Sequence, residues 1–242
     1  MDHIAQSFIA TARDKCAGKP LQIVSLGAGF DTLFFRLKAA GLLQAGDVVY
    51  EVDFPKLVKR KAALIAQSEK LKAQLSAELQ AVPDDAALQE AIKRAAERSK
   101  RLKRELRAAA EAVAAAEAAG GAKAPEAAAH SDEAADEAAA GASWSDALGG
   151  GLFTEDYRIV GADLCHMSIA EARLRAAGLD PSRPTLILSE CVLTYIGPQH
   201  ADKVLAWAGQ FFEHALLANY EQISPDDAFG VFMQSHFYKQ RE

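Results

Sequence analysis

The chain has few cysteines, and their spacing excludes the common cysteine-based sites. Only Cys16, Cys165 and Cys191 occur, and no two of them form a C-x-x-C pair. We therefore expect neither a zinc site nor a disulfide framework, and a reducing compartment is favoured. The six histidines are scattered without the spacing of metal ligands, so no metal site is predicted.

Long apolar runs are also missing. No run of 18 apolar residues occurs, so no transmembrane helix is expected, and the N-terminus lacks the basic-then-apolar pattern of a signal peptide. The formal net charge of −6 argues against general nucleic-acid binding. With 242 residues, half of them hydrophobic, the chain can build one sizeable domain. We expect a cytoplasmic protein without a membrane or nucleic-acid partner.

A short apolar strand that runs into a glycine turn is the most informative motif. Residues 21–26 predict the strand, Gly27 and Gly29 form the turn, and a helix is expected over 30–40. The glycines let backbone approach a ligand where a Cβ would clash, and the helix directs free N–H groups at the turn. An ordinary connection between strand and helix has the same pattern, so the turn alone decides little.

An acid after the next strand strengthens the argument. Residues 47–52 predict a strand, and Asp53 follows it, about 20 residues beyond Asp31, where nucleotide-binding α/β units place the carboxylate that holds a ribose. Position 32 is Thr, where a dinucleotide site has a third glycine beside the pyrophosphate. The pattern therefore favours S-adenosylmethionine, which has a ribose but no pyrophosphate, over NAD.

Strands and helices alternate along the rest of the chain. Apolar runs predict strands at 157–161, 185–189 and 215–220, and helical spacing predicts helices at 3–16, 168–177, 198–212 and 226–238, with another beginning at Pro55. The helix at 198–212 has a buried stripe of Val204, Leu205, Trp207, Ala208 and Phe211. This order predicts an α/β fold, a Rossmann-like and mostly parallel sheet with helices on both faces.

Residues 66–150 differ in composition from their surroundings, being rich in Ala, Glu, Lys and Arg and almost without aromatics. Leu64, Ser68 and Leu71 begin a series at helical spacing, and a second series follows the break at 83–85. Two long helices folded back as a hairpin are predicted, then a disordered linker over 119–150. The basic cluster at 100–104 favours a solvated helix face over a partner patch. The domain thus consists of 1–65 and 151–242 with an insertion between them.

Acids follow three of the predicted strands, namely Asp53, Asp163 and Glu190. The carboxyl ends of parallel strands meet at one edge of the sheet, where ligands of such folds bind. Solvated loop carboxylates are the alternative, because acids are common in loops. We favour a shared site, in which acids hold ribose hydroxyls and an adenine N–H and face a positively charged sulfonium.

Five sequence blocks together resemble the leucine carboxyl methyltransferases. The blocks are Leu26–Thr32, Glu51–Pro55, Gly161–Leu164, Ser189–Tyr195 and Asn219–Gln222, and the resemblance covers 3–65 and 152–242. It implies the class I fold of S-adenosylmethionine-dependent methyltransferases. The family includes enzymes that methylate the C-terminal leucine of the protein phosphatase 2A catalytic subunit. It also includes a branch that modifies a hypermodified tRNA base and bacterial methyltransferases of small molecules.

The resemblance implies a set of cofactor-binding residues. Gly27, with Gly29 in the same block, would line the methionine part of S-adenosylmethionine, and Asp53 would take the ribose hydroxyls. Asp163 and Leu164 would hold and sandwich the adenine.

Two further roles follow from the Ser189–Tyr195 block. Glu190 would face the methionyl ammonium of the cofactor. Tyr195 would lie near the methyl-transfer channel, which makes it the candidate catalytic residue.

The expected function is methylation of the C-terminal leucine carboxylate of the phosphatase 2A catalytic subunit, whose tail would be the partner. The Ser189–Tyr195 and Asn219–Gln222 blocks favour this branch. A leucine carboxylate is ionised at neutral pH and is already the nucleophile, so no general base is required. The alternatives are carboxyl methylation of a small molecule or modified tRNA base, and a catalytically incomplete remnant that binds the cofactor or docks a partner.

The chain also departs from the family pattern at both ends. The basic N-terminal segment that clamps the cofactor carboxylate and two C-terminal strands are not found, which leaves the strand at 215–220 as a sheet edge. A fragment is the favoured explanation, ahead of a natural short form or an inactive remnant.

Overall fold

Five parallel strands form one sheet in the computed structural model, which describes residues 1–16, 18–76 and 148–239. The strands are β1 Gln22–Leu26, β2 Val48–Asp53, β3 Tyr157–Gly161, β4 Thr185–Glu190 and β5 Ala215–Tyr220. Their order is β3-β2-β1-β4-β5, and every neighbouring pair is parallel. The central strands are buried along nearly their whole length, as expected for a parallel sheet covered on both faces.

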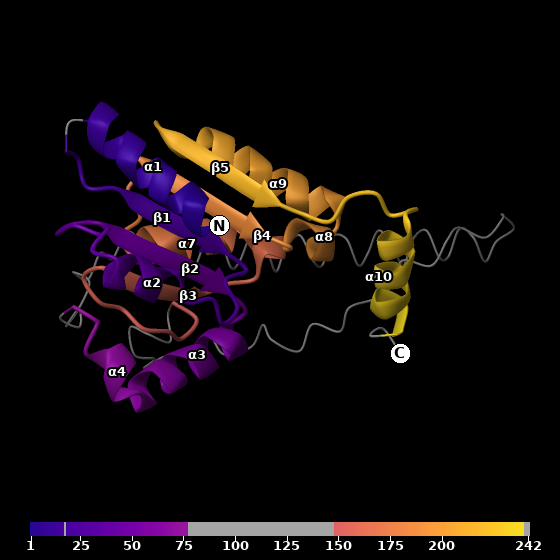
Figure 1. Ribbon diagram of the computed structural model, residues 1–242, viewed down its shortest axis with the longest axis horizontal. Helices are drawn as coiled ribbons and strands as arrows, with labels where there is room; N and C mark the ends of the chain where they lie inside the picture. The colour runs from indigo at the N-terminus through magenta and orange to yellow at the C-terminus, as the bar shows by residue number, and fades with distance from the viewer. Residues whose placement is uncertain (17, 77–147, 240–242) are drawn as a thin grey trace, which may run out of the picture.

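Helices cover both faces of this sheet (Figure 1). The helices of the described residues are α1 Asp2–Lys15, α2 Leu33–Ala39, α3 Pro55–Gln67, α4 Glu69–Lys72, the 3-10 turn η1 Leu164–His166, α7 Met167–Ala176, α8 Leu193–Ile196, α9 Pro198–Gln210 and α10 Ala228–Lys239, of which α10 stands away from the sheet. One core packs α1, α2 and α3 against the sheet, and a second core packs α7 and α9 against the opposite face. The predicted Rossmann-like α/β fold is therefore confirmed.

The strand order places a topological switch point between β1 and β4. The chain moves outward from β1 through β2 to β3, then returns to β4 on the other side of β1. The connections therefore diverge at the carboxyl ends of β1 and β4, the place where folds of this type bind ligands. Gly27 follows β1 at this point, and Glu190 ends β4.

The first long helix predicted for the insertion is interrupted. Helix α3 ends at Gln67, and Ser68 has an extended backbone with φ −101° and ψ 106°. Its hydroxyl accepts a hydrogen bond from the backbone N–H of Leu71 at 3.4 Å and thereby begins α4. A serine side chain favours such caps over helix interiors, which the apolar spacing alone did not reveal. The rest of the predicted hairpin, 77–147, lies outside the described residues.

The predicted linker ends earlier than expected, because Leu148 is fully buried in the core. Its carbonyl accepts a hydrogen bond from the N–H of Gly161, at the end of β3. Ser76 is held near the beginning of the same strand, where its hydroxyl donates to Asp156 at 2.7 Å. The two described residues next to the gap are thus both attached to β3.

Two further details concern the last elements. Leu205 is 40% exposed, whereas Val204, Trp207 and Ala208 are buried, so the predicted stripe of α9 was one residue too wide. Among the described residues β5 pairs only with β4, and it is the edge strand that the sequence predicted.

No helix in the described ranges is long and apolar enough to cross a membrane.

Candidate functional site

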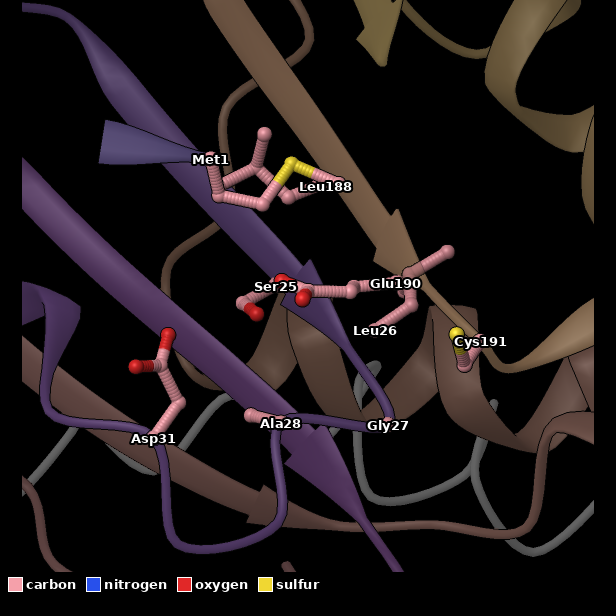
Figure 2. A pocket seen from close by; sticks show the side chains of 9 residues that line it. All are labelled: Met1, Ser25, Leu26, Gly27, Ala28, Asp31, Leu188, Glu190 and Cys191. Atoms are coloured by element: carbon pink, nitrogen blue, oxygen red, sulfur yellow. The ribbon is translucent and has the colours of Figure 1, made fainter. Parts of the chain in front are cut away.

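A pocket of about 320 Å³ lies at the switch point (Figure 2). Its lining comes from Met1, from β1, from the turn after β1 and from the end of β4: Met1, Ser25, Leu26, Gly27, Ala28, Asp31, Leu188, Glu190 and Cys191. Two of these residues carry carboxylates, and none of the lining residues is Lys or Arg. The pocket therefore suits a ligand with positive charge.

The glycine turn has the left-handed backbone that glycine permits, with φ +58° at Gly27 and +51° at Gly29. The N–H of Gly29 donates to Asp53 at 2.7 Å, and the other oxygen of Asp53 accepts from the N–H of Phe54 at 2.7 Å. The predicted turn and the predicted acid are therefore in direct contact. Each carboxylate oxygen keeps a further lone pair that can accept from a ligand hydroxyl.

The two glycines differ in the space around them, and this allows a matched comparison. A Cβ on Gly27 would lie 2.6 Å from a Val192 methyl, whereas one on Gly29 would meet nothing within 4 Å. Gly29→Ala is expected to cost about 1–2 kcal/mol from backbone strain alone. Gly27→Ala should cost about 1–3 kcal/mol more through overpacking. Urea unfolding of both variants tests this, and equal losses would contradict the close approach of Val192.

A buried ion pair lies next to the glycine turn and is attached to it through the backbone of Asp31. Lys61 of α3 pairs with Glu51 of β2, and both side chains are almost inaccessible. The Lys61 ammonium also donates to the backbone carbonyl of Asp31 at 2.7 Å. Burial raises the pKa of Glu51 to about 7, although Lys61 acts in the opposite direction. The pair was not predicted from the sequence, where its one signal is a glutamate, Glu51, inside an apolar strand.

Arg36 of α2 ties the turn to the N-terminal helix. Its guanidinium donates to Asp31 at 3.0 Å and to Asp2 of α1 at 2.6 Å. The hydrogen bond with Arg36 lowers the pKa of Asp2, against the effect of burial. The carboxylate of Asp31 also accepts from the N–H of Thr32 at 2.6 Å. This pocket acid is therefore held in place from two sides.

Asp163 caps η1 beyond the end of β3. Its carboxylate accepts from the N–H of Cys165 at 2.8 Å and lies 3.2 Å from Nδ1 of His166. Burial alone would raise the pKa of Asp163, but the His166 side chain and the Cys165 N–H together lower it to about 2. Leu164 is buried beside it. The N–H of Ala162 donates to the carbonyl of Asp53, which joins this region to the glycine turn.

The chain turns sharply after β4. Cys191 has a positive φ of 53°, and its N–H donates to the carbonyl of Tyr220 at the end of β5. Burial raises the pKa of the Cys191 thiol, as do the nearby charges of Glu221 and Glu190. Tyr195 follows on α8 and is 60% exposed.

Of the seven predicted site residues, Gly27 and Glu190 line the pocket. The others lie at or after the carboxyl ends of β1, β2, β3 and β4 but outside the pocket lining: Gly29, Asp53, Asp163, Leu164 and Tyr195. The lining also includes Asp31 and Cys191, which sequence analysis quoted within its blocks without giving them a role. The roles of all seven residues remain predictions.

Comparison with known proteins gives a consistent family. A model of the leucine carboxyl methyltransferase family matches residues 3–113 and 145–209, which extends beyond the five blocks into 66–113. The chain is 34% identical to human tRNA wybutosine-synthesizing protein 4 over 97% of its own length and 25% of that protein. It is 29% identical to rat leucine carboxyl methyltransferase 1 over 96% of its length and 50% of that protein. The chain thus spans a quarter to a half of these relatives.

Proposed function

Because the chain belongs to the leucine carboxyl methyltransferase family, we propose that it transfers a methyl group from S-adenosylmethionine to a carboxylate. The observation that supports this most is the hydrogen bond between Gly29 and Asp53 beside a pocket with two carboxylates. A glycine turn, a ribose-binding acid and an acidic pocket are the parts that such a cofactor requires.

The residues present fit this cofactor. S-adenosylmethionine carries a sulfonium and an ammonium, which the carboxylates of Glu190 and Asp31 attract. The space above Gly29 is open to a ligand. Asp53 would hold the ribose hydroxyls with its remaining lone pairs, and Gly27 would line the methionine part.

The adenine would lie beyond β3. Asp163 would accept from its amino group, because a carboxylate with a pKa of about 2 is ionised at neutral pH. The buried side chain of Leu164 would pack against the ring.

The reaction asks little acid–base chemistry of the protein. The bound cofactor supplies an electrophilic methyl group. The acceptor carboxylate is ionised at neutral pH, so the protein has to orient it and exclude water rather than remove a proton. The hydroxyl of Tyr195 would donate a hydrogen bond to the acceptor carboxylate. Its side chain is 60% exposed, which leaves it accessible to a large substrate.

For the acceptor we favour a carboxyl group on a hypermodified tRNA base over the phosphatase tail expected from the sequence blocks. Identity is higher to the tRNA wybutosine-synthesizing protein, 34% against 29%. The two blocks that favoured the phosphatase contact each other, through Glu221 and the backbone of Val192. This contact supports a shared role of the two blocks in shaping the cofactor pocket, and of their residues only Tyr195 is expected at the acceptor.

The local charge is compatible with RNA, although the net charge of −6 argued against it. No acid occurs between residues 54 and 68, directly after Asp53. Helix α3 exposes Lys56, Lys59 and Arg60 in this stretch. Phosphates would be attracted to such a surface.

Methyl transfer from labelled S-adenosylmethionine tests the proposal. Bulk tRNA from cells that lack the endogenous methyltransferase and a leucine-ended phosphatase peptide are offered separately to the full chain. We expect label in the tRNA, removed by ribonuclease and absent with Glu190→Gln. Label in the peptide alone would support the phosphatase function, and no transfer by a chain that binds the cofactor would support a remnant.

A further inference from the structure

We propose that Glu221 is a positioning residue that holds residues 190–194 against the glycine turn and so maintains the shape of the cofactor pocket. The catalytic meaning of this inference rests on the proposed function. Glu221 follows β5 and is not one of the residues that line the pocket. Its carboxylate is bonded to residues 192–194, directly after the pocket residues Glu190 and Cys191.

One carboxylate makes three hydrogen bonds to the segment that leaves β4. One oxygen of Glu221 accepts from the backbone N–H of Val192 at 3.0 Å and from that of Leu193 at 2.8 Å. The other oxygen accepts from the hydroxyl of Thr194 at 2.5 Å. Bonds to an ionised acceptor are stronger than neutral ones, so Glu221 is the main attachment of this segment.

The two backbone donors have no partner within their own helix. They belong to the beginning of α8, where the first N–H groups of any helix lack an intrahelical carbonyl. Val192 and Leu193 are each only 9% exposed, which limits the access of water. Removing the carboxylate would leave buried donors unsatisfied, and the segment would have to move to satisfy them.

Movement of this segment would reach the pocket directly. Val192 fills the space beside Gly27, where a Cβ would lie 2.6 Å from its methyl group. Glu190 and Cys191, which precede it, both line the pocket. A second bond, from the N–H of Cys191 to the carbonyl of Tyr220, reinforces the attachment to β5. Glu221 therefore fixes one wall of the pocket relative to the glycine turn.

The test compares Glu221→Ala and Glu221→Gln with Glu213→Ala, which removes an exposed glutamate near the same strand. Hydrogen exchange of backbone amides in 190–196 reports the attachment without any cofactor. Calorimetric titration with S-adenosylmethionine reports the pocket. For Glu221→Ala we expect the exchange rates of the amides in 190–196 and the Kd for S-adenosylmethionine each to rise about tenfold or more. This is the effect typical of losing hydrogen bonds to a charged group.

Glu221→Gln keeps an oxygen that can accept from both backbone donors, so it should recover most of the affinity, while Glu213→Ala should match the wild type. Amides of β1 and β2 should exchange at wild-type rates in every variant. Unchanged exchange in 190–196, an unchanged Kd, or a uniform rise across the sheet would each overturn the inference. A wild-type chain that does not bind the cofactor would refute the proposed function, while the exchange data would still decide whether Glu221 holds the segment.

Discussion

Lys61→Met is expected to lower the free energy of unfolding by roughly 3–5 kcal/mol at pH 8, the usual cost of removing one partner from a buried ion pair. The substitution leaves the carboxylate of Glu51 in a site that is only 2% exposed. It also removes the hydrogen bond from the ammonium to the carbonyl of Asp31. The glycine turn should loosen together with the core.

The loss should depend on pH. Burial raises the pKa of Glu51 to about 7, above its ordinary value of 4.5. A group whose pKa is raised on folding stabilises the fold fully below its ordinary pKa, and this contribution is lost as pH rises through the folded value. Without Lys61 the folded pKa rises further. The deficit of Lys61→Met should therefore be smallest near pH 5 and grow toward pH 8.

Urea unfolding at pH 5, 6.5 and 8 measures this, with Lys56→Met as the control because Lys56 is exposed on the same helix. The double variant Glu51→Leu, Lys61→Met should recover much of the loss, since an apolar pair leaves no unpaired charge. A deficit below about 1 kcal/mol at pH 8, or one independent of pH, would contradict the role of the pair.

Asp53→Ala is expected to weaken S-adenosylmethionine binding by roughly a hundredfold or more. A carboxylate that accepts hydrogen bonds from two ribose hydroxyls contributes about 1.5–3 kcal/mol for each hydrogen bond. A change of about 1.4 kcal/mol corresponds to a tenfold change in Kd. The alanine variant also removes the two hydrogen bonds that the Asp53 carboxylate accepts from the backbone N–H groups of Gly29 and Phe54.

Asp53→Asn separates these two effects, because its amide oxygen can still accept from one backbone N–H while its charge is gone. We expect an intermediate affinity by calorimetry. The matched control is Asp202→Ala, an exposed acid on α9. An affinity within threefold of the wild type for Asp53→Ala, well under 1 kcal/mol, would show that Asp53 is not the ribose ligand.

The sheet was predictable because its strands are short apolar runs bounded by turns and acids, a pattern that follows from burial on both faces. The contact between the glycine turn and Asp53 was predictable because the turn and the acid occur at a spacing tied to one topology. Lys61 and Glu221 were not, since each acts on a partner that only the folded chain brings near. The predictions of an unbroken helix through Ser68 and of a linker through Leu148 were wrong for a local reason. The overall composition of a segment reveals neither a single capping serine nor a single buried leucine.

The attachment of Ser76 and Leu148 to opposite ends of β3 has a consequence for engineering. A five-residue strand is about 17 Å long, so a replacement connection of about six to eight residues would reach from one attachment to the other. Closure entropy changes slowly with loop length. The fold thus provides a port where segments of very different size can be exchanged between the amino end of β3, at Asp156, and its carboxyl end, at Gly161.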